Sequence, residues 1–160
     1  MTQPVPKAWQ QLLRQIQVWK MASDTIVFTN GCFDVLHPGH LHSLAEAKAQ
    51  GDRLIVGINS DASVARAKGP TRPICEEAWR LQVVQALHLV DAAVLFDQDT
   101  PETLIRYLRP DVLVKGMDYA PDQVVGASFV QEYGGRLHLA ALKEGYSTTS
   151  WLNNLLKNQG

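Results

Sequence analysis

The sequence has few cysteines, no excess of positive charge and no long hydrophobic run. Its two cysteines, Cys32 and Cys75, form no CxxC pair, which excludes a disulfide framework and favours reduced thiols. Its 15 Lys and Arg residues are balanced by 16 Asp and Glu residues, so no nucleic-acid surface is predicted. No apolar stretch approaches the roughly 20 residues of a membrane helix, and the N-terminus does not read as a signal peptide. We therefore predict a cytoplasmic protein that binds neither membrane nor nucleic acid.

Two common phosphate-binding motifs are also missing. The chain has no GxxxxGK[ST] sequence, which excludes a P-loop, and no GxGxxG after its first predicted strand, which disfavours a dinucleotide-binding fold. Any phosphate site must therefore be built from a few individually placed groups.

Short apolar runs alternate along the chain with amphipathic segments. Strands are predicted over residues 25–29, 53–58, 92–96, 111–115 and 136–142. Helices are predicted over residues 7–20, 38–50, 61–67, 76–89, 100–108 (with Thr100 as N-cap), 123–133 and 149–157. This alternation predicts a single α/β domain, Rossmann-like, with a five-stranded parallel sheet and helices on both faces. It covers residues 1–160, with an N-terminal helix in 1–22 and a catalytic core in 25–154.

The loop after the first strand contains His37-Pro38-Gly39-His40 at the mouth of a predicted helix. Ligands of parallel sheets bind at the carboxyl ends of the strands, and a helix N-terminus favours anions. Gly39 lets the backbone approach a phosphate, and two imidazoles nearby are suited to stabilise charge that develops at phosphorus. The pattern favours phosphate chemistry that needs positioning rather than a covalent nucleophile.

Three other interpretations of this loop stay open. The two histidines are compatible with a surface residue and an ordinary helix-capping residue. With His42, Cys32 and Asp34 nearby, they are also compatible with a zinc site. A cysteine hydrolase with Cys32 as nucleophile and His37 as base lacks a setting that would favour a thiolate.

Polar and charged groups follow the later strands. Ser147, Thr148 and Thr149 precede the last predicted helix, where they either cap that helix or hold a triphosphate. Lys115 ends the fourth predicted strand, either facing the cleft or as a solvated strand end. Lys68 and Arg72 lie in a predicted loop over residues 68–73, and Arg80 lies in the helix predicted after it. These three cations either swing over bound phosphates or are ordinary surface cations.

Taken together, these segments resemble the cytidylyltransferase-like nucleotidyltransferases of the HxGH superfamily. Phe28–His40 resembles the signature loop of that family. Within it, the similarity is greatest to adenylyltransferases that convert D-glycero-β-D-manno-heptose 1-phosphate to ADP-heptose, and it rests on residues 57–61, 68–73, 113–119 and 145–149. The resemblance extends from about residue 25 to about residue 154.

The resemblance implies that ATP and heptose 1-phosphate react to give ADP-heptose and pyrophosphate, with Mg²⁺, for the inner core of lipopolysaccharide. It implies catalytic roles for His37, His40 and Lys115. It implies nucleotide contacts by Thr29, Asn30, Gly31, Phe33, Gly39, Gly145, Ser147, Thr148 and Thr149. It implies substrate contacts by Asp34, Asn59, Arg72, Arg80 and Asp118. No protein side chain is predicted to bind metal.

The resemblance leaves rival functions and partners to be tested. A cytidylyltransferase for glycerol phosphate or another alditol phosphate would use the same loop, and a regulatory module that senses ATP would keep the loop without turnover. Many relatives fuse this domain to a sugar kinase, and no stretch of this sequence is long enough to be that kinase. A separate heptose kinase is therefore expected to supply the substrate. Relatives also commonly associate, which implies a homo-oligomer. The helix with Trp9 and Trp19 would pack either on a partner subunit or on its own sheet.

Overall fold

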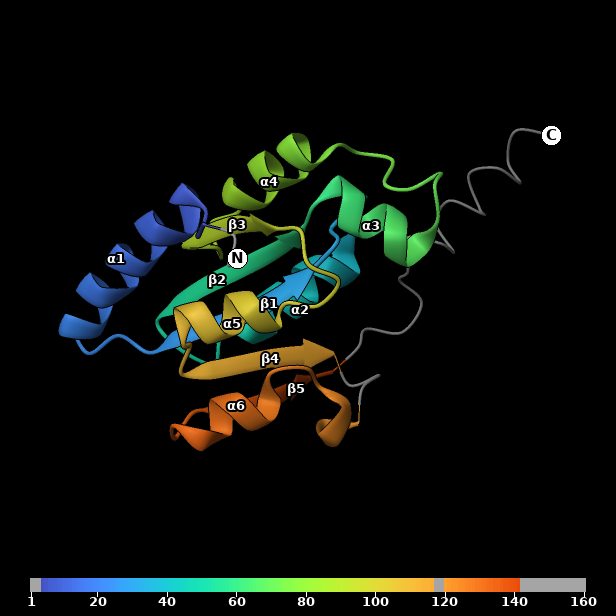
Figure 1. Cartoon of the computed structure of the whole chain (residues 1–160). Coiled ribbons are helices and arrows are strands. Elements are labelled where there is room, and N and C mark those ends of the chain that lie inside the picture. Colours follow the sequence, from blue (N-terminus) through green and yellow to red (C-terminus); the bar gives the residue numbers. More distant parts are fainter. Residues whose placement is uncertain (1–3, 117–119, 142–160) are drawn as a thin grey trace.

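Five parallel strands form one sheet in the order β3-β2-β1-β4-β5, as Figure 1 shows. This computed structural model describes residues 4–116 and 120–141. The strands are β1 (Ile26–Gly31), β2 (Arg53–Asn59), β3 (Ala92–Phe96), β4 (Val112–Gly116) and β5 (Arg136–Ala140). Every neighbouring pair is parallel, which confirms the predicted fold class.

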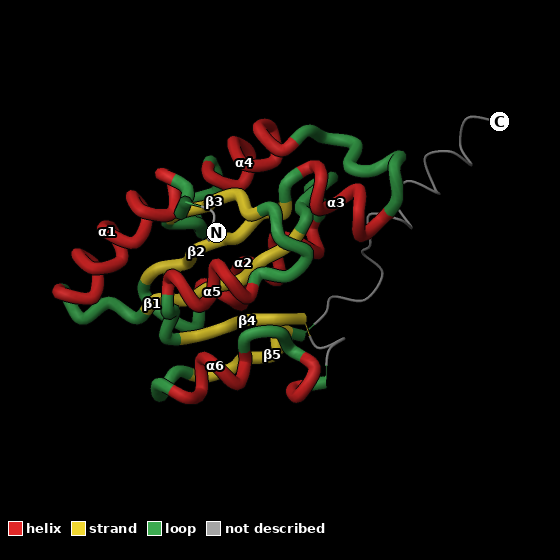
Figure 2. The backbone as a smooth tube through the Cα atoms, in the orientation of Figure 1, coloured by secondary structure: helices red, strands yellow, loops and turns green. Residues whose placement is uncertain are grey.

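Helices cover both faces of the sheet (Figures 1 and 2). They are α1 (Lys7–Met21), α2 (Pro38–Lys48), α3 (Asp61–Lys68), α4 (Glu77–Gln85), α5 (Glu102–Leu108) and α6 (Ala127–Glu132), with a short 3₁₀ turn η1 (Pro121–Gln123). Helices α2 and α4 pack on one face, and α1, α5 and α6 pack on the other. Because side chains alternate along a strand, Phe28 of β1 enters one core and its neighbour Val27 enters the other.

Helix α1 packs on the sheet of its own chain. Trp9, Leu12, Ile16 and Trp19 are all buried in the core that contains Phe28 of β1. The indole Nε1 of Trp9 also donates a hydrogen bond to the carbonyl of Leu95 in β3, at 2.9 Å. The apolar face of α1 is therefore occupied within the domain, so α1 is part of the core rather than an appended segment.

Helices α2 and α5 are slightly shorter than the sequence indicated, and α4 and α6 are clearly shorter. Helix α4 ends at Gln85 rather than residue 89, because the chain turns there to enter β3, although the residues of the turn are themselves apolar. Helix α6 begins at Ala127 rather than residue 123, because Gly126 adopts a left-handed conformation with φ +87°. Thr100 is not the N-cap of α5: Pro101 occupies that position without a side-chain cap. The predicted helix over 149–157 lies outside the described residues.

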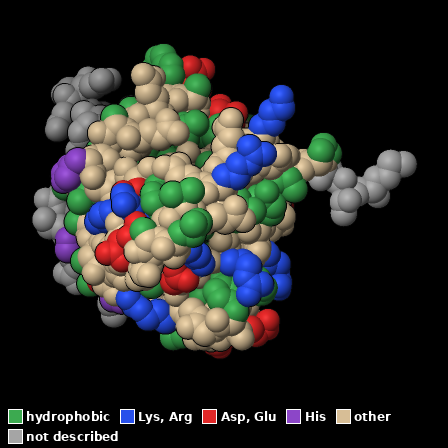
Figure 3. All heavy atoms as spheres, turned by 90° about the vertical axis from the view of Figure 1, so that its left-hand side faces the viewer, with side chains coloured by type: hydrophobic (Ala, Val, Ile, Leu, Met, Phe, Trp, Pro, Cys, Tyr) green, Lys and Arg blue, Asp and Glu red, His purple; other side chains and the backbone are tan. Residues whose placement is uncertain are grey.

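Acidic and basic side chains are mixed on the face at the amino ends of the strands, which Figure 3 shows. Several of them form ion pairs there. Lys48 and Arg53 both contact the carboxylate of Asp91, and Lys20 contacts that of Asp111. Asp91 also accepts a hydrogen bond from the N–H of Leu54, the second residue of β2, and Asp111 accepts one from the N–H of Ile26, the first residue of β1. Among the described residues, no helix is long and apolar enough to cross a membrane.

Candidate active site

The two histidines of the HxGH loop lie against each other at the first turn of α2. Their ring centroids are 3.9 Å apart and their planes are inclined by 28°, so the imidazoles are stacked. The Nδ1 atom of His37 accepts a hydrogen bond from the Gly39 N–H at 3.1 Å, and the Nδ1 atom of His40 accepts one from the His37 N–H at 3.3 Å. The histidines themselves thus cap the helix, in place of the usual Ser, Thr or Asp.

This capping arrangement fixes the protonation state of both rings. A nitrogen that accepts a hydrogen bond carries no proton, so the proton of each neutral ring lies on Nε2. Burial lowers the pKa of His37. Burial, reinforced by the charges of His37 and Lys68, lowers the pKa of His40 to about 4. At neutral pH the pair is therefore uncharged and presents two Nε2–H donors beside the N-terminal amides of α2.

The histidines follow β1, next to the point in the sheet where the order of successive strands reverses. Successive strands run outward from β1 through β2 to β3, and on the other side from β4 to β5, so the reversal lies between β1 and β4. The β1–β4 ladder pairs only Val27 with Val112 and Phe28 with Leu113. Beyond that ladder, the Thr29 hydroxyl bridges the two strands by donating to the Val114 carbonyl at 3.1 Å. Open α/β sheets bind ligands at such a reversal.

Asn30 and Lys115 also lie at the carboxyl ends of their strands, which we call this edge of the sheet. Asn30 lies one residue before the end of β1, and its buried Oδ1 atom has no hydrogen-bond partner in the described part of the chain. Lys115 lies one residue before the end of β4. The structure therefore brings His37, His40, Thr29, Asn30 and Lys115 to the same edge, as the sequence predicted.

The Phe33 ring packs against the ring of His40. Its ring centroid lies 5.3 Å from that of His40, and the residue is only 7% exposed. Its backbone is left-handed, with φ +48°, and its ring lies where a Cβ on Gly31 would meet it at 3.0 Å. The Phe33 ring packs in the core against His40, and the nucleotide contact that the resemblance implies for Phe33 stays a prediction. Gly31 leaves the room that the ring needs.

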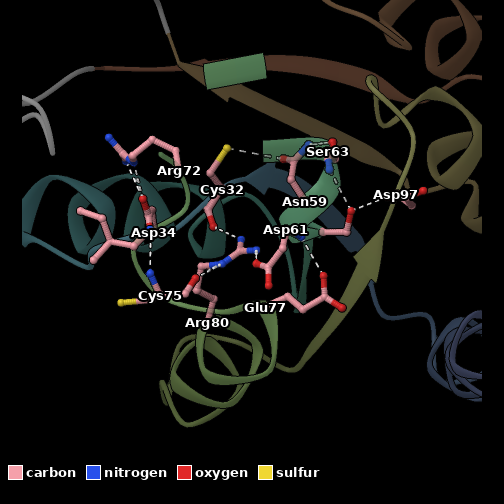
Figure 4. Close-up of polar contacts among 12 residues, drawn as sticks. Cys32, Asp34, Asn59, Asp61, Ser63, Arg72, Cys75, Glu77, Arg80 and Asp97 are labelled. Carbon is pink, nitrogen blue, oxygen red and sulfur yellow. Dashed lines mark hydrogen bonds and ion pairs between the residues drawn. The ribbon is translucent and has the colours of Figure 1, made fainter. Parts of the chain in front are cut away.

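Asp34 and Arg72 form an ion pair with each other (Figure 4). The Asp34 carboxylate accepts hydrogen bonds from the Arg72 guanidinium at 2.6 Å and from the N–H groups of Ile74 and Cys75 at 2.8 and 2.9 Å. Burial alone would raise the pKa of Asp34, but these hydrogen bonds outweigh it and lower the pKa. Asp34 is 4% exposed, and its predicted contact with substrate stays a prediction. Its carboxylate holds the 69–76 loop against the HxGH loop.

Arg80 is also not a mobile cation over the phosphates. Its side chain is 1% exposed, and its guanidinium joins three separate segments (Figure 4). It donates to the Cys32 carbonyl in the HxGH loop, to the Cys75 carbonyl at 2.9 Å and to the Asp61 carboxylate of α3 at 2.7 Å. The Arg80 guanidinium therefore holds three segments of the protein together, and its predicted contact with substrate stays a prediction.

Asn59 ends β2, beside the HxGH loop. Its amide donates to the Ser63 hydroxyl at 3.0 Å, and the Cys32 thiol lies 3.9 Å from its Oδ1 atom (Figure 4). The predicted residues Asp118, Gly145, Ser147, Thr148 and Thr149 lie outside the described residues.

Lys68 acts electrostatically on His40, a role that the sequence did not predict. Sequence reasoning placed it in a loop as an ordinary cation, but it is the last residue of α3, and its charge contributes to the lowered pKa of His40. Its proximity to His40 depends on how α3 follows β2, which no local pattern reveals.

The geometry does not favour the zinc and cysteine-hydrolase interpretations. Among the described residues, no group of three or more His, Cys, Asp or Glu side chains is arranged to hold a metal ion. The carboxylate of Asp34 is already bound by Arg72 and backbone amides. The Nδ1 atom of His37 is occupied by the Gly39 N–H, and the Cys32 thiol faces Asn59.

The strand order and the histidine-capped helix at the switch point are those of a nucleotidyltransferase-type α/β domain. The chain belongs to the cytidylyltransferase-like family, whose model matches residues 28–150. This confirms the resemblance drawn from the HxGH loop.

Curated relatives and solved structures agree with this assignment. Proteins named "Bifunctional protein HldE" from Gluconobacter oxydans and Caulobacter vibrioides are each 54% identical to this chain over 88% of its length. The chain covers only 29% of each of these relatives. A lipopolysaccharide core biosynthesis protein from Thermoplasma volcanium is 31% identical, with a TM-score of 0.62 over 78% of this chain and 99% of that chain. A pantoate–β-alanine ligase from Francisella tularensis, 15% identical with a TM-score of 0.55, shares the fold over 82% of this chain and 66% of its own.

Proposed function

We propose that this chain transfers AMP from ATP to D-glycero-β-D-manno-heptose 1-phosphate, giving ADP-heptose and pyrophosphate for the lipopolysaccharide inner core. The observation that carries the transfer chemistry is the stacked His37–His40 pair, held with both Nε2–H groups as donors at the N-terminus of α2. The choice of heptose phosphate is supported by the 54% identity to the bifunctional HldE proteins and by the likeness to a lipopolysaccharide core biosynthesis protein.

In the proposed reaction, an oxygen of the acceptor phosphate attacks the α-phosphorus of ATP in line with the departing pyrophosphate. One P–O bond forms and one breaks, so no covalent enzyme intermediate is needed. The Nε2–H donors of His37 and His40 stabilise the negative charge that develops on the phosphoryl oxygens. The positive end of the α2 dipole adds to this stabilisation, whereas the first-turn amides themselves donate within the protein, from Gly39 to the His37 ring and from His40 to the His37 carbonyl. Lys115, at the end of β4, is proposed to hold the acceptor side of the reaction.

Magnesium is proposed to reach the site on ATP, as part of the substrate. The acceptor carries a phosphate on its anomeric carbon, so a sugar kinase must act before this reaction. We propose that this kinase step is catalysed outside residues 1–160.

The decisive experiment is a pyrophosphate-release assay with two nucleotides and two acceptors. ATP with heptose 1-phosphate should give rapid release, whereas CTP with heptose 1-phosphate and either nucleotide with glycerol 3-phosphate should give little. Release only with CTP and glycerol phosphate would replace the proposal with an alditol-phosphate cytidylyltransferase. Tight ATP binding without release in the presence of heptose 1-phosphate would indicate a nucleotide sensor instead.

A further inference from the structure

The amide of Asn30 contains a polar atom that the rest of the protein leaves unpaired. Its Oδ1 atom is buried and has no hydrogen-bond partner among residues 4–116 and 120–141. The residue as a whole is only partly buried, like the other residues at the end of β1. Buried polar atoms in folded proteins are almost always paired, because an acceptor that loses water without gaining a donor lowers stability. The unpaired oxygen of Asn30 therefore indicates a partner that is absent from the chain itself.

The residues around Asn30 do not supply the missing donor. Asn30 faces Gly57 across the β1–β2 ladder, and glycine has no side chain. A Cβ on Gly57 would lie 2.8 Å from the Phe28 ring and 3.3 Å from Leu104, so apolar side chains adjoin this position. The Cβ of Asn30 would also lie 3.3 Å from it. The neighbouring hydroxyl on β1, that of Thr29, already donates to a carbonyl of β4.

The side chain of Asn30 lies on the opposite face of the sheet from the histidine pair. Because side chains alternate along a strand, Asn30 shares a face with Phe28, whose core is covered by α1, α5 and α6 (Figure 1). Phe33, which packs against His40, belongs to the other core, which α2 and α4 cover. A substrate that crosses the carboxyl end of β1 would therefore meet the histidines on one side and Asn30 on the other.

Lys115 occupies the corresponding position on the neighbouring strand β4. The β1–β4 ladder pairs Phe28 with Leu113, and both residues pack in the same core. Two residues further along each strand, this register brings Asn30 and Lys115 side by side on that face, beyond the end of the ladder. The unpaired amide thus adjoins the lysine that is proposed to hold the acceptor.

We propose that Asn30 is a specificity-determining residue, whose amide oxygen accepts a hydrogen bond from a sugar hydroxyl of the substrate. This inference rests on the proposed function for the identity of the sugar. An amide oxygen is only an acceptor, which excludes the oxygens of an ionised phosphate, and the apolar surroundings disfavour a charged donor. Because the side chain is partly exposed, a turn about its χ2 bond presents the oxygen to the open edge of the sheet.

Two sugars could supply this hydroxyl, the heptose of the acceptor and the ribose of ATP. The position beside Lys115 favours the heptose. In either case, a substrate that lacks the hydroxyl would leave the amide oxygen unpaired in the complex as well. A site of this kind rejects a deoxy analogue more strongly than an apolar pocket would, because the analogue fills the space without satisfying the oxygen.

The test compares Asn30→Leu, Asn30→Ala and Gln85→Leu in the full chain. Leucine has nearly the shape of asparagine without its polar atoms, and alanine removes the amide without adding bulk. Gln85 is a matched control, because it carries the same amide group, which already donates to the Ala93 carbonyl at 3.2 Å. For both Asn30 variants we expect a roughly tenfold rise in KM for heptose 1-phosphate, with kcat changed less than about threefold. Gln85→Leu should keep the wild-type KM for both substrates.

The two sugars are distinguished by which KM changes. A rise in KM for ATP alone would assign the hydroxyl to the ribose. In that case 2′-deoxy-ATP and 3′-deoxy-ATP identify the group, because the analogue that lacks it should have a lower kcat/KM than ATP in the wild type but not in Asn30→Leu. With heptose 1-phosphate as the source, both deoxy analogues should affect the wild type and Asn30→Leu equally.

The Tm of the ligand-free proteins supplies a readout that needs no activity. Removing an unpaired buried acceptor should leave the Tm of Asn30→Leu equal to or above that of the wild type. Wild-type KM values for both substrates in the two Asn30 variants, whatever their Tm, would overturn the proposal and leave Asn30 with a structural role. If the wild type released no pyrophosphate, the proposed function would fail. Calorimetric titration of the same variants with ATP and with heptose 1-phosphate would then still decide whether Asn30 binds a sugar hydroxyl.

Discussion

At the scale of single residues, His40 has two separable tasks. Its Nδ1 atom accepts the His37 N–H and so caps α2, while its Nε2–H is proposed to stabilise the transition state. Asparagine can keep the first task, because its side-chain oxygen can accept the same N–H, but it cannot place a donor where Nε2 lies. Alanine removes both.

The first prediction separates these tasks. Both His40→Asn and His40→Ala should lower kcat, by roughly 10² to 10³, which is typical of losing one donor to developing charge. Only His40→Ala should also lose about 1 kcal/mol of unfolding free energy, the usual cost of a lost helix cap. Steady-state kinetics and urea denaturation of both variants measure the two effects. Wild-type turnover in His40→Asn would exclude Nε2 from the chemistry.

The second prediction concerns the protonation of His40. Because its pKa is lowered to about 4 in the folded protein, the ring should stay neutral through the pH range in which an exposed histidine titrates. The unfolded chain takes up that proton at higher pH, so between the unfolded pKa and about 4 the folded state loses stability as pH falls. Above the unfolded pKa this contribution does not change with pH.

An NMR titration of the histidine ring protons checks this directly. The resonance that disappears in His40→Asn should titrate with a midpoint near 4 in the wild type. A midpoint near 6.5 would mean that the ring is not held neutral by burial and by the charges of His37 and Lys68.

The residues that sequence reasoning placed correctly are those whose setting is local. The helix mouth at His37 and His40 follows from four consecutive residues and the strand before them. Arg80 could not be placed in this way, because it bonds to Cys32 and Asp61, which lie 48 and 19 positions away. The residues next to Arg80 on α4 do not distinguish a cation that faces phosphate from one that faces the protein interior.

At the scale of elements, amphipathic spacing predicted α1 well but left its partner open. The spacing of Trp9, Leu12, Ile16 and Trp19 defines one apolar face, whereas the choice between its own sheet and another subunit depends on tertiary geometry. The same limit explains the overlong α4. The apolar residues after Gln85 continue the helical pattern, although the backbone there is turning toward β3.

The third prediction tests the packing of α1 with two substitutions on the same helix. Ile16 is 1% exposed and Val18 is 64% exposed. Ile16→Ala should lower the unfolding free energy by roughly 2–5 kcal/mol, because it leaves a cavity in the main core. Val18→Ala should change it by less than about 0.5 kcal/mol. Equal effects in urea denaturation would mean that α1 does not pack on the sheet through this face.

At the scale of the whole molecule, the switch point unites segments that are distant in sequence. The HxGH loop, the end of β4 and the 69–76 loop are held at one edge by Thr29, Asp34 and Arg80. A ligand that contacts several of these segments binds only while they are held together. Its binding free energy is therefore added to the free energy of unfolding.

The fourth prediction follows from that linkage. At an ATP concentration 100 times its Kd, binding to the folded state alone should add about 2.7 kcal/mol of stability. For a chain of this size, each kcal/mol raises Tm by roughly 2–4 °C, so differential scanning calorimetry with Mg-ATP should show a rise of about 5–10 °C. AMP lacks the β- and γ-phosphates that the mouth of α2 is proposed to hold, so it should raise Tm far less at the same concentration. Equal shifts with AMP and ATP would mean that the adenosine carries the binding and that the histidine-capped helix does not grip the triphosphate.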